Sequence, residues 1–315
     1  MVERETVVIG CHWRERLSEL AFVTRSIAGA ATREGPVSVL VPGPVGEIEP
    51  DGTFDLEGFG VDGALRWPPR LAAVGAVVVD RLTREVATLL ADAGPRAVFT
   101  LSTSTAEVHE PSCRRLHLVP APDADPSLLV TVHVPVNPAA EQHRHHGFGF
   151  TGYLIVLSDR PGEPEDPPPA VAWLSAAFPE AEIILVENAV ASAWKGRALR
   201  GKAHVDTRMD FWRLVAHAAL CIDLDPGRCI ARECIESLRL GTPIIVPEDS
   251  EIATMHARAS GGSTFGDPAE LLTAVGRLQN ENERSAASDA GRRYADAWYG
   301  DAGALVERVR MLLLQ

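Results

Sequence analysis

The chain has 315 residues, of which 46% are hydrophobic and 23% are charged, and its formal net charge is −13. This length favours two domains of ordinary size, and the composition is that of a folded globular protein and not of a disordered one. The negative charge argues against nucleic acid as the main partner, because phosphate-backbone binding needs clustered Lys and Arg.

Cysteine usage and hydropathy predict the compartment. The five cysteines form no Cys-x-x-Cys pair, so we expect reduced and mostly buried thiols in a cytosolic protein. No N-terminal segment resembles the apolar core of a signal peptide, and no window reaches the length of a membrane span. We therefore expect a cytoplasmic protein, while peripheral contact with a membrane and the oligomeric state stay open.

The chain begins with the pattern of a doubly wound α/β domain. A short apolar run at 6–10 predicts a buried strand, the apolar spacing at 13–31 predicts a helix, and 37–41 predicts a second strand. Such sheets bind ligands at the carboxyl ends of their strands. Gly10 and His12 lie at the end of the first strand, so both are candidate substrate-binding residues.

Residues 42–73 are rich in Pro, Gly and acidic residues, and they contain the sequence GFGVDG at 58–63. This sequence fits Gly-x-Gly-x-x-Gly, but the dinucleotide-binding mechanism needs a strand before the motif and a helix after it. Its flanks are predicted to be loops, so we interpret the match as a coincidence. The sequence GFGFTG at 147–152 precedes a predicted strand and is interpreted in the same way.

Four further strands and one helix are predicted to complete the first domain. The strands are expected at 76–80, 96–101, 116–119 and 128–134, and the helix at 83–93. His109 and Glu110 lie in the polar loop after the second of these strands. His109 is a candidate catalytic residue that would meet an acceptor hydroxyl, and a solvated loop is the alternative interpretation.

An interdomain linker is predicted at 135–146. It contains four consecutive basic residues, His143 to His146, but no second set of Cys, Asp or His stands at ligand spacing, so no metal site is predicted. The expected domains are 1–136 together with the C-terminal helix 301–315, and 137–300. Because predicted strands are joined through helices, we expect two Rossmann-like domains with parallel sheets and a cleft between them.

The second domain is predicted to alternate strands and helices. The strands are expected at 153–157, 182–186, 203–206, 218–223, 244–247 and 262–265. The helices are expected at 171–178, 189–199, 209–216, 229–240, 268–279 and 281–299. A last helix, at 302–314, is the C-terminal helix assigned to the first domain.

The segment 217–252 says most about function. A buried strand at 218–223 is followed by a turn at 225–227 and by an amphipathic helix at 229–240, which Gly241 ends. This order of elements predicts a βαβ unit.

The helix at 229–240 has two predicted faces. Ile230, Cys234 and Leu238 recur at helical spacing and should face the sheet, whereas Glu233 and Glu236 should project from the other side.

The N-terminus of this helix is a candidate anion site. Its first N–H groups have no partners within the helix, and two arginines lie beside them, which favours a bound diphosphate. The candidate residues are Gly227, Arg228, Cys229, Ile230 and Arg232. The alternative interpretation is that Arg232 and Glu236, four residues apart, form only a solvated ion pair.

This segment resembles the donor site of the retaining GT-B glycosyltransferases, particularly family 4. Their pattern has a glutamate, a Gly-rich turn, a second glutamate eight positions on, and a tail with Gly-x-Pro before an apolar strand. Glu236 matches the second glutamate, and Gly241 and Pro243 match the tail. The resemblance implies that Glu236 binds the ribose of a nucleotide-sugar. Arg228 stands where the family has the first glutamate, which lies close to the transferred sugar.

The resemblance extends over most of residues 150–300. It implies that the loop 204–208, with Asp206, cups the nucleotide base, and that 248–251 meets the sugar phosphate. The family holds the donor diphosphate with a Gly-Arg motif and a nearby lysine. Here Arg160 is a shifted substitute for that motif.

We therefore predict a glycosyltransferase that moves a sugar from a nucleotide-diphosphate-sugar to an acceptor hydroxyl, with retention and without a metal or a separate cofactor. His109, Arg160 and Arg228 are the candidate catalytic residues. The alternative is a catalytically silent GT-B homologue that acts as a binding or partner subunit, and a dehydrogenase or another nucleotide-binding enzyme is the third hypothesis.

Overall fold

The structure, a computed structural model, places the chain in two compact units. One unit comprises Met1–Val134 and Ala302–Gln315, and the other comprises Pro135–Asp301. The residues that the structure describes are 5–10, 19–33, 35–42, 55–59, 74–79, 86, 90, 97–102, 114–117, 129–131, 154–159, 168–188, 194–198, 208–224, 230–300 and 302–313.

The described part of the first unit contains a parallel sheet with the strand order β3-β2-β1-β4-β5-β6-β7. The strands are β1 (Glu5–Ile9), β2 (Val37–Pro42), β3 (Asp55–Phe59), β4 (Val74–Val79), β5 (Ala97–Ser102), β6 (Arg114–His117) and β7 (Leu129–Thr131). The helices are α1 (Glu19–Ala31) and the C-terminal α9 (Ala302–Leu313). Residues 86 and 90 are helical, within the helix predicted at 83–93.

Consecutive apolar residues form the core of the first unit because parallel strands are buried on both faces. Val7 and Val8 on β1 are fully buried, and Ala21 and Ile27 of α1 are buried as well. Helix α1 packs on β1 and β2, and α9 packs on α1 with Leu305 buried. The C-terminal helix thus belongs to the first unit.

Strand β3 corrects one prediction. Residues 42–73 were expected to be loop, but β3 pairs in parallel with β2, and Gly58 lies opposite Val41. Its sequence, DLEGF, has no continuous apolar run. An edge strand, which has a neighbour on one side only, tolerates such a sequence. The motif at 58–63 therefore begins inside a strand, and residues 60–63 lie outside the described residues.

The second unit contains a six-stranded sheet with the order β10-β9-β8-β11-β12-β13 in the described residues. The strands are β8 (Leu154–Asp159), β9 (Glu182–Asn188), β10 (Trp194–Ala198), β11 (Leu220–Asp223), β12 (Ile244–Pro247) and β13 (Ser263–Phe265). The helices are α3 (Pro169–Ala177), α4 (Arg208–His217), α5 (Arg232–Leu240), α6 (Glu251–Ser260), α7 (Pro268–Gln279) and α8 (Glu281–Tyr299).

The prediction of a helix at 189–199 is wrong, because β10 occupies part of that range and pairs antiparallel with β9. The segment WKGRA has a glycine at its centre, which disfavours a helix, and pairing with the sheet edge satisfies its backbone groups. The remaining strand pairs of this sheet are parallel. The strand expected at 203–206 lies outside the described residues.

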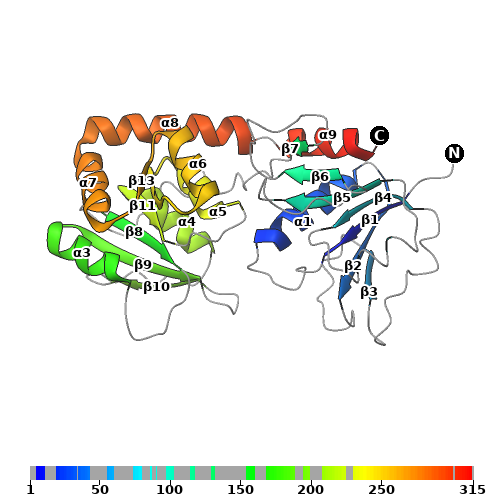
Figure 1. The fold of residues 1–315 in the computed structure, drawn as a ribbon, viewed down its shortest axis with the longest axis horizontal. Helices are drawn as coiled ribbons and strands as arrows, with labels where there is room; N and C mark the ends of the chain where they lie inside the picture. The colour runs from blue at the N-terminus through cyan, green and yellow to red at the C-terminus, as the bar shows by residue number, and fades with distance from the viewer. Residues whose placement is uncertain are drawn as a thin grey trace. The chain divides into compact units, whose positions relative to one another are not determined.

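Helices cover both faces of the second sheet. Ile183 and Leu185 of β9 belong to a core cluster that includes residues of α3 and α7. Ile184 and Val186 point to the opposite face and pack with residues of α4. Helix α8, the long orange helix in Figure 1, runs past α5, α6 and α7. The contacts of α8, together with those of α4 and α6, surround α5, the helix that carries the candidate anion site.

Candidate functional site

The strand order of the second sheet reverses between β8 and β11. From β8 the chain continues through α3 to β9 on one side, whereas from β11 it continues through α5 to β12 on the other side. Asp223, the last residue of β11, lies opposite Ser158 of β8. Ligands of open α/β sheets bind where the strand order reverses in this way. The start of α5 therefore lies at the preferred ligand position of this sheet.

Several predicted site residues lie in segments outside the described residues. These are His12, His109, Arg160, Asp206, Gly227, Arg228 and Cys229. Their roles stay predictions. The described candidates are Gly10, Ile230, Arg232 and Glu236.

In the first unit, the sheet order also reverses, here between β1 and β4. Gly10 directly follows β1 and is buried, and its N–H donates to the carbonyl oxygen of Leu40 at 2.9 Å. Gly10 thus lies at the ligand-binding edge of its own sheet.

Helix α5 begins later than predicted. The helix was expected from Cys229, but it begins at Arg232, and Ala231 before it has the left-handed backbone angles φ 48° and ψ 55°. Among the described residues, Ala231 is the non-glycine residue with positive φ. A left-handed conformation costs an L-residue roughly 1–2 kcal/mol, so surrounding contacts must hold this bend. Ile230 and Ala231 are both buried and form the bend instead of the helix.

The N-cap residue of α5, Ala231, provides no side-chain cap. The first N–H groups of a helix have no partner within it and carry the positive end of the helix dipole. In α5 the N–H of Cys234 donates to the carbonyl oxygen of Ala231, and Arg232 lies in the first turn. A helix N-terminus with a cation beside it is a typical position for a bound anion.

Arg232 and Glu236 form an ion pair that is buried. The Arg232 Nε donates to the Glu236 Oε1 at 2.9 Å, and the side chains are 14% and 0% exposed. The interpretation as a solvated ion pair is therefore wrong. Arg232 is the accessible member of the pair, and Glu236 fixes its guanidinium at the first turn of α5.

Glu233 and Glu236, which were expected on the side of the helix opposite its sheet-facing stripe, are both buried. The two glutamates are 3% and 0% exposed, because α4, α6 and α8 pack around α5. The helix is amphipathic in sequence, but helices from other parts of the chain pack around it, and α8 contacts it at Ile235 and Leu238. Local periodicity carries no information on that contact.

Cys234 connects α5 to the end of β11. Its Sγ donates to the Oδ2 of Asp223 at 3.4 Å, and both residues are buried. The predicted orientation of Cys234 toward the sheet agrees with this contact. Asp223 thus has a structural contact at the end of β11, where the strand order reverses.

A buried histidine that the sequence analysis did not single out contacts the bend before α5. His256 of α6 is 0% exposed, and its Nε2 lies 2.9 Å from the carbonyl oxygen of Ile230. Its Nδ1 lies 2.8 Å from the hydroxyl of Tyr294 on α8. The only local signal is the position of His256 among the apolar residues of α6, which does not reveal its partners.

The phenols of this cluster are shielded from water. Burial raises the pKa of Tyr294 from 10.0 to about 12, and burial likewise raises the pKa of Tyr299 well above 10.0. The rings of His256, Tyr294 and Tyr299 meet edge to face, with centroids 5.6 to 6.1 Å apart.

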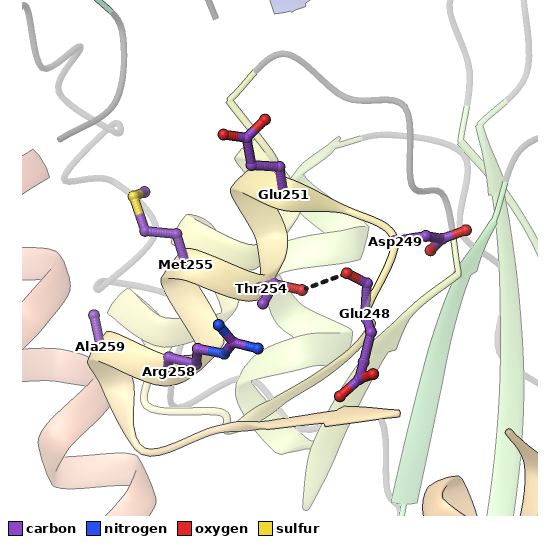
Figure 2. Close-up of a pocket in the computed structure, with 7 residues that line it drawn as sticks. All are labelled: Glu248, Asp249, Glu251, Thr254, Met255, Arg258 and Ala259. Atoms are coloured by element: carbon purple, nitrogen blue, oxygen red, sulfur yellow. Dashed lines mark hydrogen bonds between the residues drawn. The ribbon is translucent and has the colours of Figure 1, made fainter. Parts of the chain in front are cut away.

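A separate cavity of about 680 Å³ lies where β12 leads into α6 (Figure 2). It is lined by Glu248, Asp249, Glu251, Thr254, Met255, Arg258 and Ala259. The Thr264 hydroxyl donates to the Glu248 carboxylate at 3.2 Å, which fixes one wall.

This cavity and the bend before α5 lie on different sides of α6. Glu251, Thr254 and Arg258 share one face because they follow the i, i+3, i+7 pattern. His256 is two positions from Thr254 and from Arg258, so it points to the opposite face of the helix.

The described residues contain neither a metal-ligand cluster nor a membrane span. Within the ranges given above, no three His, Cys, Asp or Glu side chains gather as metal ligands would. No helix in this part of the chain has the length and apolar content to cross a bilayer. The linker histidines at 143–146 lie outside these ranges.

No protein-family profile matches the sequence, and no curated protein matches it. Solved structures do match over nearly the whole chain. HepE from Anabaena, in complex with UDP and glucose, has a TM-score of 0.68 at 11% identity, covering 98% of this chain and 99% of that one. Sucrose-phosphate synthase from Thermosynechococcus elongatus has a TM-score of 0.63 at 13% identity, covering 98% of each chain.

A third match shows why the fold does not name the reaction. A Listeria monocytogenes protein assigned as a UDP-N-acetylglucosamine 2-epimerase has a TM-score of 0.56 at 11% identity, covering 98% of this chain and 95% of that one. At such identities the likeness shows the fold alone. The chain has the mixed α/β, GT-B fold that the sequence resemblance implied.

Proposed function

We propose that this protein is a glycosyltransferase that moves a sugar from a nucleoside-diphosphate sugar to an acceptor hydroxyl. The observation that carries the proposal is the start of α5, where a helix N-terminus and Arg232 lie at the strand-order reversal of the second sheet. The GT-B fold of HepE, solved with UDP and glucose, supports a nucleotide-sugar as the substrate class. Family 4 membership, retention of configuration, hexosyl transfer and independence from metal are parts of the proposal.

In the proposed reaction, the bond between the sugar and the diphosphate breaks, and negative charge develops on the leaving diphosphate. Preorganised donors that face this charge usually contribute most to catalysis of this kind. The N–H groups at the start of α5 and the Arg232 guanidinium would supply them here. The sequence adds Arg228 and Arg160 as further cations for the same diphosphate.

Glu236 has a different role in this proposal from the one that the family resemblance implied. Its carboxylate is fully buried and bonded to Arg232, so it holds the phosphate-binding cation in position. The nucleotide ribose would be bound by other groups.

On the acceptor side, Gly10 lies at the carboxyl edge of the first sheet. His12 and His109 are the proposed polar groups of that side, with His109 as the group that meets the acceptor hydroxyl.

The burial of Glu236 also favours a second candidate function, the catalytically silent homologue. In that case the fold remains, but the chain acts as a binding or partner subunit and transfers no sugar. Arg228, in the place of the glutamate that lies near the sugar in the family, points the same way.

The test is a thermal-shift panel of UDP, GDP, ADP and dTDP, followed by assays for hydrolysis and transfer of the matching nucleotide-sugars. A diphosphate at about a hundredfold over its Kd stabilises a protein by about 2.7 kcal/mol, which raises Tm by a few degrees. Arg232→Met should remove most of the shift, whereas Arg293→Met, at an exposed position of α8, should leave it unchanged.

Each outcome of this test separates the hypotheses. A shift together with sugar transfer or hydrolysis supports the enzyme. A shift without any turnover supports the silent homologue. No shift at millimolar concentration of any diphosphate overturns the donor site and the glycosyltransferase proposal, and it favours the partner-subunit form of the silent homologue.

A further inference from the structure

The bend at Ile230 and Ala231 sets where α5 begins, and therefore where its first N–H groups point. The apolar pattern of the sequence continues back to Cys229, so the local preference is for a longer helix. The left-handed angles of Ala231 oppose that preference. A contact from outside the segment is needed to hold the bend.

His256 provides this contact from α6. Its Nε2 lies 2.9 Å from the Ile230 carbonyl oxygen, and the ring is fully buried. In a continuous helix, the Ile230 carbonyl would accept a hydrogen bond from the N–H four residues later. Here His256 supplies a donor to that carbonyl, and the N–H groups of Cys234 and Ile235 donate to the carbonyl oxygen of Ala231.

The neighbours of His256 determine its tautomer. A carbonyl oxygen only accepts hydrogen bonds, so Nε2 carries the hydrogen. In the neutral ring, Nδ1 then accepts from the hydroxyl of Tyr294, 2.8 Å away. The donor direction therefore runs from Tyr294 on α8 through His256 to Ile230.

We infer that His256 is a positioning residue for the proposed diphosphate site, which comprises Arg232 and the start of α5. By bonding to the Ile230 carbonyl, His256 holds the bend that orients the first N–H groups of α5. This inference rests on the proposed function, because the proposed function assigns this site to a nucleoside diphosphate. His256 itself touches no substrate. It acts through the backbone of Ile230 and Ala231.

The test uses two substitutions that both introduce a side-chain amide. The two amides differ in which nitrogen of the histidine ring, Nε2 or Nδ1, they can stand in for. In His256→Gln the amide NH₂ reaches the position of Nε2 and keeps the donor to Ile230. In His256→Asn the shorter amide reaches only the position of Nδ1, so the contact to Ile230 is lost. Both variants replace the ring with a smaller neutral amide, so a purely structural effect should lower the stability of both.

The Kd for UDP is measured by calorimetry in the full chain, together with the free energy of unfolding in urea. We expect His256→Asn to raise the Kd about tenfold, the size of one hydrogen bond, and His256→Gln to stay within about threefold of wild type. Equal weakening by both variants, or no weakening by either, overturns the positioning role. Tyr294→Phe, which leaves the Ile230 contact in place, should also stay close to the Kd of wild type.

A second measurement separates this inference from the proposed function. Amide hydrogen exchange at residues 230–235 is followed without any nucleotide. His256→Asn should alter the exchange of these amides, and His256→Gln should not. If wild type fails to bind UDP or any other diphosphate, the proposed donor site is wrong, and unchanged exchange in His256→Asn then shows that His256 does not hold the bend either.

Discussion

Glu236 and Arg232 form an ion pair within one turn of α5, with 2.9 Å between Oε1 and Nε and no solvent exposure at the glutamate. In the glycosyltransferase family that the sequence resembles, the matching glutamate binds ribose. Here it binds an arginine at the helix start. The position that matches the family's ribose-binding glutamate is therefore part of a buried ion pair in this chain.

This geometry predicts a large stability effect for Glu236→Ala. Removing one member of a buried ion pair leaves an uncompensated charge and typically costs 3–5 kcal/mol, so we expect a loss of about 3 kcal/mol in the free energy of unfolding. Urea denaturation of the full chain measures it. The double variant Arg232→Met with Glu236→Leu should recover much of the loss, because well-packed apolar residues often replace a buried pair without destabilisation.

The control is a pair of the same residue types on the surface. Arg310 and Glu307 on α9 lie 3.3 Å apart, with side chains 51% and 62% exposed. Glu307→Ala should change the free energy of unfolding by less than about 1 kcal/mol, since exposed pairs contribute little. A small loss for Glu236→Ala, similar to that of the control, would contradict the buried pair.

The sequence predicted helices best where local signals mark both ends. The predicted bounds 268–279 and 281–299 are those of α7 and α8. Asp267 accepts from the N–H of Glu270 at the start of α7, and Asn280 accepts from Asn282 and Glu283 at the start of α8. These caps are formed by residues adjacent in sequence, so they can be recognised without the fold.

Two strands were missed because their stability comes from the sheet edge that they join. β3 and β10 are the outermost strands on one side of their sheets, and neither has a continuous apolar run. Their propensity is weak, and the pairing partner decides the conformation.

The candidate site was predicted only in outline. The order of strand, turn and helix predicts an anion site near Arg232, and that site stays a prediction. The burial of Glu236, the left-handed Ala231 and the contact from His256 all depend on α6 and α8, which follow later in the chain. Tertiary contacts of this kind leave no trace in the periodicity of α5.

A second prediction concerns alkaline pH. The pKa of Tyr294 is about 12 in the folded protein, above the ordinary 10.0, and that of Tyr299 is raised as well. A raised pKa means that the unfolded chain loses its phenolic protons first. The stability that these neutral tyrosines provide is therefore complete below pH 10 and is lost as the pH rises from 10 toward 12, by at most about 1.4 kcal/mol per pH unit for each tyrosine.

The measurement is the free energy of unfolding of wild type and Tyr294→Phe between pH 8 and about 11.5. At pH 8 the variant should be less stable, because the hydrogen bond to His256 is lost. The difference should narrow as the pH rises past 10, because phenylalanine cannot ionise. A difference that stays constant over this range would show that Tyr294 titrates normally. Because the chain has only three tyrosines, the tyrosinate absorbance of the folded protein gives an independent check.

The last prediction uses one substitution at two helical glycines to test the packing of α8 on α5. Gly276 in α7 is exposed, and a Cβ there would meet no atom within 4 Å. Gly291 in α8 is buried, and its Cβ would lie 2.8 Å from the Cδ2 of Leu238 on α5. Alanine favours a helix over glycine by about 1 kcal/mol at either site, whereas overpacking a core typically costs 1–3 kcal/mol.

Gly276→Ala should therefore raise the free energy of unfolding by about 1 kcal/mol. Gly291→Ala should lower it by about 1 kcal/mol, because Leu238 is 1% exposed and has little room to move. Urea denaturation of both variants decides the matter, and a stabilising effect at both sites would mean that α8 lies farther from α5 than the structure places it.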